Sequence, residues 1–409
     1  MSDEARPTRG PVALLRDPTF GPYFVGKLLS TCGVWVQNLA AAVLMFELTR
    51  SAFMVGLVSV AQFVPTLFLA LWAGALVDRF DRRLVLLGGR VVSGGLIGVL
   101  AGLLLARGTD GFGGEPVLLA SILLAGVGWA VSNPAGQALI PALVPPADLE
   151  GALAVNAVAP SLARTLGPAL GAGLLLLGGP SMAFVAAAAA HLTFAAILLV
   201  IRPRPFERPR TRPSVWGGVA YLREDPRAAA LILGVATLAV GADPAITLTP
   251  SLADELGGGG EVVGLFASAF GVGAVLFTVG FRGLRRFLSL RGTGITGFYA
   301  LSGGLLILAA SSTVTGGVVG FLVAGFGFMM ATVALNTRIQ RRVPEELRGR
   351  VMALWGLAFL GSRPFAAMLN GALADGISIR VAVLATALLT LVSSTLARVR
   401  YPEPAPPPD

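Results

Sequence analysis

The chain alternates long apolar stretches with short polar breaks. Crossing the hydrocarbon core of a membrane takes roughly 20 apolar residues in a helix, and about twelve stretches reach that length. They span approximately residues 20–46, 53–77, 84–106, 116–140, 151–178, 181–201, 228–252, 261–281, 292–312, 315–338, 350–374 and 377–398. Because lipid offers no hydrogen-bond partner to exposed backbone, we predict that each stretch is a membrane-spanning helix. The expected fold class is an all-α membrane protein.

The longest polar break divides the predicted helices into two groups of six. Residues 202–227 (RPRPFERPRTRPSVWGGVAYLREDPR) are rich in proline and arginine, which is typical of a linker. We therefore expect an N-terminal six-helix half at 20–201 and a C-terminal six-helix half at 228–398. Polar tails are expected at 1–19 and 399–409.

The two halves resemble each other in sequence. ALVPPADLEGALA opens the fifth predicted helix and RRVPEELRGRVMA opens the eleventh. Arg164 and Arg363 follow at matching places, each close to a proline. Two parallel six-helix halves with a central site are a known plan of membrane transporters.

Composition and charge agree with this plan. The 409 residues are 55% hydrophobic and 13% charged, whereas soluble domains carry about 25% charged residues. Most of the 31 Lys and Arg residues lie on the side of the N-terminus, a set in which we include Arg90. On the other side the breaks hold Arg50, Arg107 and Arg380. The positive-inside rule then predicts cytoplasmic termini in the cell membrane, and the net charge of +9 reflects topology rather than a nucleic-acid partner.

The break between the second and third predicted helices carries an ordered group of charges. GALVDRFDRR, residues 74–83, contains Gly74, Asp78, Arg79, Arg82 and Arg83. A glycine allows another helix to approach closely, an aspartate can bind the positive end of a helix, and arginines can bind lipid phosphates. The matching GFRGLRRFLSLRG of the second half lacks the acids. The simpler alternative is that these arginines only fix the topology.

These residues resemble the major facilitator superfamily, and more narrowly its drug- and siderophore-exporting branch, the transmembrane secretion effectors. The G-x-x-x-D-R-x-x-R-R signature of the superfamily matches residues 74–83. GVWVQNLAAAVLMFELTRSAFMVGLVSVAQFVP resembles the first two spans of the branch, and NPAGQALIPALVPPADLEGALAVNAVAPSLARTLGPALGAG its fourth and fifth. The resemblance covers residues 16–400. It implies two pseudo-symmetric bundles and a conformational latch at 74–83 that holds the outward-open state against the eleventh span.

The fifth predicted helix carries a pattern that resembles the G-x-x-x-G-P-x-x-G-G of exporters. Its members here are Gly167, Pro168, Gly171 and Gly173. Ala163 stands at the place of the first glycine, and Ala172 separates the last two. Glycines three or four residues apart give a helix a smooth face, so ordinary tight packing is the alternative reading.

Ionisable residues inside a span are costly and therefore point to function. Lys27, Arg164, Asp243 and Arg363 are of this kind, and Pro244 should break the seventh helix next to Asp243. Asp243 and Arg363 lie at similar depths in the seventh and eleventh spans, which are neighbours in the superfamily. We expect them to form an ion pair, and the rival hypothesis makes Asp243 the proton carrier.

Polar and aromatic side chains of the first and fourth spans are the candidates for a substrate cavity, because these spans line it in the superfamily. They are Trp35, Gln37, Asn38, Trp129 and Asn133. The branch often has an acid where this chain has Val34, and many exporters have an arginine in the fourth span, which is absent here. Two features linked to proton coupling are therefore missing. His191 is expected to be a packed core residue.

The resemblance implies a monomeric secondary transporter that exports a small organic molecule by alternating access. An antibiotic, a siderophore or another natural product would leave by proton-coupled efflux, as in an antiporter. No cofactor and no metal are expected, and the motifs HExxH, GxSxG and the P-loop of enzymes are absent from the sequence. The alternatives are an uptake carrier or facilitator, a membrane-bound enzyme, and a sensor that has kept the fold.

Overall fold

The protein is described by a computed structural model that covers residues 9–204, 215–284 and 288–400. Helices make up its secondary structure, and this part of the chain contains no strand. The predicted linker at 202–227 and both predicted tails lie partly outside the described residues. Within the linker, α7 (Val215–Glu224) is helical.

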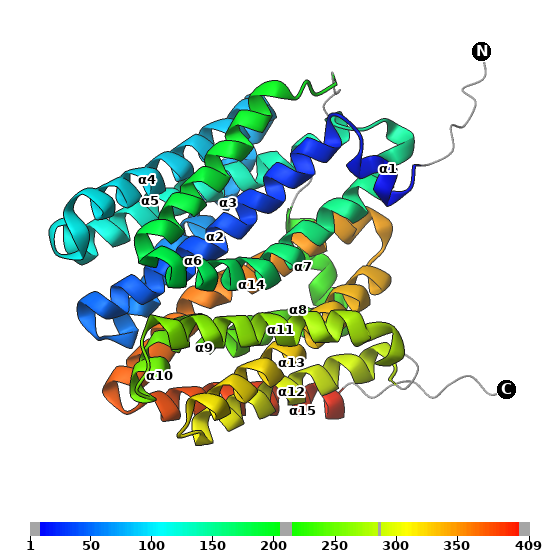
Figure 1. Ribbon diagram of the computed structural model, residues 1–409. Helices are drawn as coiled ribbons and strands as arrows, with labels where there is room; N and C mark the ends of the chain where they lie inside the picture. Colours follow the sequence, from blue (N-terminus) through cyan, green and yellow to red (C-terminus); the bar gives the residue numbers. More distant parts are fainter. Residues whose placement is uncertain (1–8, 205–214, 285–287, 401–409) are drawn as a thin grey trace, which may run out of the picture. The chain divides into compact units, whose positions relative to one another are not determined.

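The chain divides into two compact units, which are described separately (Figure 1). Unit 1 contains residues 1–48 and 61–210, and unit 2 contains residues 49–60 and 211–409. The helices that contribute to unit 1 are α1 (Pro11–Leu15), α2 (Phe20–Thr49), α3 (Ala52–Arg79), α4 (Arg82–Gly111), α5 (Gly114–Leu139), η1 (Ile140–Ala142), η2 (Pro146–Asp148) and α6 (Leu149–Val200). The helices of unit 2 after α7 are α8 (Pro226–Ala242), α9 (Pro244–Thr247), α10 (Thr249–Glu255), α11 (Gly260–Leu284), α12 (Leu290–Ala310), α13 (Val314–Arg342), α14 (Glu345–Gly376) and α15 (Ile379–Arg400).

Helix α6 contains two membrane-spanning segments. Its backbone leaves helical geometry at Gly178 and at Gly179, where φ is 65°. Glycine adopts this left-handed conformation without steric penalty, and Pro180 then suits the first turn of the next helix. Eleven stretches of the described chain are long and apolar enough to cross a membrane, and α6 counts as one of them. Because α6 contains two segments, the described part agrees with the twelve predicted spans.

The seventh predicted span is broken where its sequence contains Pro244. Helix α8 ends at Ala242, α9 follows at Pro244, and α10 begins at Thr249. Proline cannot donate the backbone hydrogen bond that would continue α8. The predicted break is therefore confirmed, and it places Asp243 at the junction of two helices.

Close helix packing in both units depends on small residues. A Cβ atom on Gly297 of α12 would lie 2.5 Å from the backbone nitrogen of Ala331 in α13. In unit 1, a Cβ atom on Gly89 of α4 would lie 2.5 Å from the backbone oxygen of Gly128 in α5. Such spacing leaves no room for a side chain, and it lets backbones approach as is common between membrane helices.

Unit 2 also holds the connection between α2 and α3. The Asp375 carboxylate at the end of α14 accepts hydrogen bonds from the Ser51 hydroxyl at 2.5 Å and from the backbone N–H groups of Ala52 and Phe53 at 2.8 and 3.0 Å. An acid suits this place because the first N–H groups of a helix have no partner inside the helix. Asp375 therefore caps the start of α3.

Candidate transport site

A buried arginine lies at the centre of the polar cluster of unit 1. The Arg90 side chain of α4 is 3% exposed, and its guanidinium carbon lies 4.4 Å from the ring centre of Trp129 in α5. Its Nη1 donates a hydrogen bond to the Ser30 hydroxyl of α2 at 3.3 Å. Our assignment of Arg90 to the polar break is therefore wrong. Asp81 caps α4, so the helix begins at Arg82 and Arg90 lies about two turns inside it.

A chain of buried hydrogen bonds continues from Ser30. The Ser30 hydroxyl lies 2.8 Å from Nδ1 of His191, and Nε2 of His191 lies 3.3 Å from Oε1 of Gln37. The Gln37 amide nitrogen donates to Oε1 of Gln62 at 2.8 Å. Because an amide oxygen can only accept, the proton of a neutral His191 ring belongs on Nε2. This assignment gives every hydrogen bond the same direction, from Arg90 to Gln62.

Part of this cluster was predictable from the sequence. Gln37 and Trp129 were predicted to line the cavity, and both contact the network of Arg90 or His191. His191 is buried as expected, yet its ring takes part in the hydrogen-bond chain. Gln62 was missed because a single polar residue in an apolar span gives little signal.

A second cation of unit 1 is held by two amides. The Lys27 ammonium of α2 donates hydrogen bonds to Oε1 of Gln137 at 2.6 Å and to Oδ1 of Asn156 at 2.7 Å. Asn156 in turn donates to Gln137 at 3.0 Å. These contacts join α2, α5 and α6 without a carboxylate.

The polar site of unit 2 surrounds Asp243. Its buried carboxylate accepts hydrogen bonds from the Thr247 hydroxyl at 3.0 Å and from the Asn370 amide of α14 at 2.8 Å. The Asn370 oxygen accepts from the Thr386 hydroxyl of α15 at 2.7 Å. Arg363 is also buried, and its charge attracts that of Asp243. The predicted partners thus share one unit, although Thr247 and Asn370 were not foreseen. Arg164, in unit 1, is partly exposed.

The glycines of the fifth span differ in their surroundings. A Cβ atom on Gly167 would lie 2.5 Å from Cβ of Trp35 in α2, and one on Gly171 would lie 3.3 Å from the Val36 Cα atom. A Cβ atom on Gly173 would meet no described atom within 4 Å. Pro168 lies inside α6. Gly167 and Gly171 therefore allow α2 to pack closely on α6. This packing is independent of any role of the pattern in export.

The arginines of the predicted latch contact carbonyl groups within unit 1. Arg82 donates to the backbone oxygen of Ala138 at 2.9 Å, and Arg83 donates to the backbone oxygens of Leu198 and Leu199 near the end of α6. Cations are favourable at helix C-termini, where carbonyls lack partners. The Arg79 side chain is exposed, and a Cβ atom on Gly74 would meet nothing described within 4 Å. The Asp78 side chain lies outside the described residues.

Solved structures of membrane transporters share this fold. A crystal structure of the nucleoside transporter NupG superposes with a TM-score of 0.68 at 13% identity and covers 94% of this chain and 99% of that one. A bacterial homologue of the iron transporter ferroportin, solved in an inward-facing state, gives 0.69 at 20% identity and covers 94% and 99%. The fold is that of a major facilitator transporter, a multi-pass membrane protein.

The family of the chain can be stated more narrowly than its fold. The family model described as transmembrane secretion effector matches residues 9–405, and the chain belongs to this family. The enterobactin exporter EntS of Citrobacter koseri is 28% identical over 412 residues, which are 95% of each chain. The enterobactin exporter EntS of Shigella boydii serotype 4 is 28% identical over 351 residues, 83% of this chain and 81% of that one. The chain is thus a secondary transporter rather than an enzyme.

Proposed function

We propose that the protein exports a small organic molecule rich in oxygen, of the siderophore class, by alternating access. The observation that carries this proposal is a set of buried polar atoms in unit 1 without a hydrogen-bond partner among the described residues. They are Nδ2 and Oδ1 of Asn38, Nε2 of Gln62, Oγ1 of Thr66, Nε of Arg90 and Nε1 of Trp129. Buried polar atoms are nearly always satisfied. Since most of these atoms are donors, they suit a ligand with many acceptor oxygens.

The charges of unit 1 favour an anionic ligand. Arg90 and Lys27 contact hydroxyl, amide and aromatic groups, and neither has a carboxylate within salt-bridge distance in the described part of the chain. A buried cation without a counter-ion is costly. An acidic oxygen of a catecholate or carboxylate would supply that counter-ion, which is consistent with relatives named as enterobactin exporters.

The proposal also includes the direction of transport and its source of energy. Export is supported by the names of the relatives and by the exporter-like pattern around Pro168. We infer that a proton gradient drives it, with Asp243 as the ionisable group of unit 2, and that the protein works as a monomer with both termini in the cytoplasm. The positive-inside distribution of arginine supports that orientation.

Transport into inverted membrane vesicles tests the function. The probe is a radiolabelled catecholate siderophore, and the variants are Arg90→Gln and Arg107→Gln, which remove the same charge from α4. Arg107 is exposed. Because charge-assisted hydrogen bonds are worth about 1.5–3 kcal/mol, Arg90→Gln should raise the KM roughly tenfold to a hundredfold. Arg107→Gln should behave as wild type.

Two results would contradict the proposal. Equal transport by the Arg90→Gln and Arg107→Gln variants would remove Arg90 from the substrate site. Movement of the probe only into right-side-out vesicles would favour the uptake carrier instead of the exporter.

A further inference from the structure

A large cavity lies inside unit 2, away from Asp243 and Arg363. Its volume is about 1080 Å³, and its lining comes from the end of α7 and from α8, α12, α13 and α15. Helix α12 packs against both α13 and α15 (Figure 1). Neither member of the predicted ion pair is among the lining residues. The cavity therefore requires an explanation separate from the transport site.

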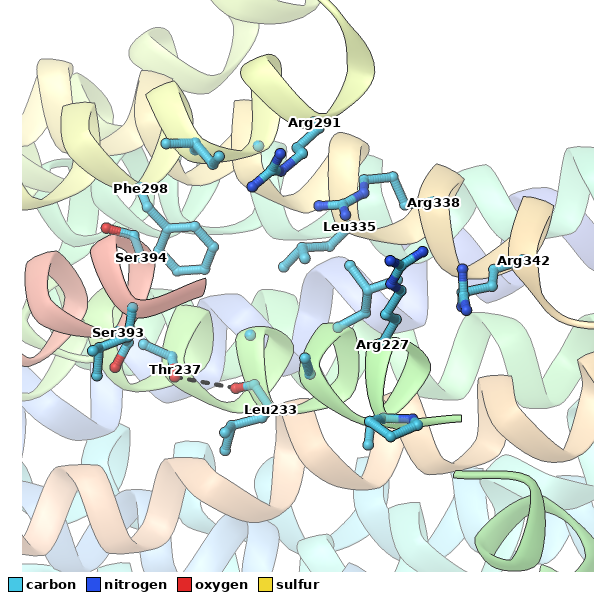
Figure 2. A pocket seen from close by; sticks show the side chains of 18 of the residues that line it. Arg227, Leu233, Thr237, Arg291, Phe298, Leu335, Arg338, Arg342, Ser393 and Ser394 are labelled. Atoms are coloured by element: carbon cyan, nitrogen blue, oxygen red, sulfur yellow. Dashed lines mark hydrogen bonds between the residues drawn. The ribbon is translucent and has the colours of Figure 1, made fainter. Parts of the chain in front are cut away.

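The chemistry of the lining changes from one end of the cavity to the other. Six arginines line it, namely Arg223, Arg227, Arg291, Arg338, Arg341 and Arg342. Figure 2 shows Arg227, Arg291, Arg338 and Arg342 on one side, and Phe298, Ser394 and Thr237 on the other. The described lining contains no carboxylate. The nearby Asp225 binds Arg342 at 2.6 and 2.9 Å.

The apolar part of the cavity reaches the surface of unit 2 at two exposed leucines. Leu233 on α8 is 68% exposed and Leu396 on α15 is 62% exposed, and both line the cavity. Leu231, Phe298 and Leu335 form its buried wall. Exposed leucines in a membrane-spanning bundle suit contact with acyl chains, because lipid tails are as apolar as leucine. A ligand with an apolar chain can therefore enter sideways from the membrane.

The matching region of unit 1 holds a buried aromatic pair. Tyr23 and Phe194 pack there with ring centres 5.7 Å apart, in a buried cluster with Leu86 and Leu139. Phe194 and Ser393 are separated by as many residues as Arg164 and Arg363, the pair that relates the two halves. A serine thus lines the cavity of unit 2 where unit 1 has a phenylalanine. Unit 1 has a smaller cavity of about 480 Å³ between the start of α2 and the end of α6, and its lining contains one arginine where that of unit 2 contains six.

We propose that this cavity binds a phospholipid with an anionic headgroup, whose phosphate contacts the arginines and whose acyl chain lies along α8 and α15. Basic pockets between membrane helices on the cytoplasmic side suit such headgroups. By the orientation proposed above, the lipid comes from the inner leaflet. The acyl chain distinguishes this ligand from inorganic phosphate, which has the chemistry of the headgroup but no apolar chain.

Two kinds of variant distinguish the binding of the headgroup from the binding of the acyl chain. Arg291→Gln combined with Arg338→Gln removes two cations from the lining. Gly234→Leu keeps every arginine but fills the apolar part, because a Cβ atom at Gly234 has room at 3.4 Å from Leu335 and a longer side chain must enter the cavity. Arg348→Gln is the matched control, since Arg348 is an exposed cation of α14 outside the lining.

Native mass spectrometry of the full chain measures the retained lipid. The protein is released from nanodiscs of equal parts phosphatidylglycerol and phosphatidylcholine, and inorganic phosphate is tested separately. Wild type and the Arg348→Gln variant should retain phosphatidylglycerol. The double arginine variant should bind it about 30-fold more weakly, since each cation near a membrane contributes about 1 kcal/mol. Gly234→Leu should weaken it comparably, and millimolar phosphate should not displace it.

Three results would overturn the proposal. They are equal retention by the double arginine variant and the Arg348→Gln control, equal retention of the two lipids by wild type, and undiminished binding by Gly234→Leu together with displacement by phosphate. The last result would identify a phosphate site instead. Melting temperatures in the same detergent show whether each variant is folded. Because no transport is measured, the outcome does not depend on the proposed function.

Discussion

Arg90 illustrates how a charge is accommodated inside a membrane helix. Its guanidinium group lies over Trp129, reaches the ring of Phe194 at 5.9 Å and donates to Ser30. A desolvated cation–π contact is worth about 2 kcal/mol or more, which offsets part of the cost of burial. The sequence showed the residue but not its depth, because the start of α4 depends on the cap at Asp81. A helix start placed at the cap would have found it.

At the same scale, we predict that Asp243 and Arg363 stabilise each other. Removing one partner of a buried pair costs about 3–5 kcal/mol, whereas removing both is often milder. Asp243→Asn should therefore lower the amount of folded protein and its melting temperature. Combining it with Arg363→Gln should restore part of both, as measured by fluorescence size-exclusion chromatography and thermal unfolding in detergent.

The rival role of Asp243 gives a different result. If Asp243 carries the proton, the double variant should fold and bind substrate but fail in gradient-driven transport. If the double variant is no more stable than the Asp243→Asn variant, the two charges do not form a stabilising pair.

At the scale of the elements, the contact between α2 and α6 depends on Gly167 more than on Gly173 of the same glycine pattern. Gly167→Ala would place a methyl group against Trp35, and overpacking typically costs about 1–3 kcal/mol. The variant should have a lower melting temperature than wild type. Gly173→Ala is the matched control, because its methyl group would meet no described atom. If both variants melt together, α2 and α6 are not closely packed in the membrane.

The helices were predictable from the sequence, and the polar contacts between them were only partly so. Apolar stretches fix a membrane helix because the backbone has no alternative. The chain from Ser30 through His191 to Gln37 joins residues of two distant helices, and no local pattern indicates such pairing. The partners of the Asp243 carboxylate were missed for the same reason. Proline was informative at Pro244, where the helix is interrupted.

A contact far apart in the sequence ties the N-terminal element to unit 1. Asp148 accepts hydrogen bonds from the backbone N–H of Arg9 at 2.9 Å and from its Nε at 2.6 Å, and Arg9 also donates to Asp17 at 2.8 Å. The hydrogen bonds from the backbone and the side chain of Arg9 lower the pKa of Asp148 below its ordinary value. Arg9 precedes α1 and Asp148 follows α5, so the contact joins two places on either side of these helices in the sequence.

The lowered pKa of Asp148 predicts a dependence of stability on pH. A carboxyl group with a lowered folded-state pKa stabilises the protein above its unfolded pKa of about 3.9, and this contribution is lost as the pH falls. Asp148→Asn should therefore lower the melting temperature at pH 7, and its difference from wild type should shrink as the pH falls below about 4. Asp110→Asn, at an exposed acid of α4, should change little. A difference that stays constant from pH 7 to about pH 2 would contradict the role of Asp148.

For the whole molecule, the loop signature predicts a change in transport without a change in topology. Asp78→Asn leaves the arginines that orient the protein, so the variant should insert normally. If residues 74–83 act as a conformational latch, its transport rate in vesicles should fall at least severalfold. Accessibility of cysteines introduced at the loops measures the topology. A wild-type rate in correctly inserted protein would leave these residues with a topological role alone.

The energy source is also a property of the whole molecule. The sequence contains no P-loop, so transport by purified protein in liposomes should follow an imposed proton gradient and stop when an uncoupler is added. ATP in the absence of a gradient should have no effect. Substrate accumulation that needs ATP and survives the uncoupler would contradict membership of the secondary transporters.

The break inside α6 has a consequence for biogenesis. The two segments are separated by Gly178 and Gly179 alone, without a polar connection that could remain in water while one segment inserts. If one segment inserted alone, the backbone and apolar side chains of the other segment would remain at the membrane surface. The two segments should therefore leave the translocon together as a helical hairpin, and a ribosome stalled between them would hold neither in its final position.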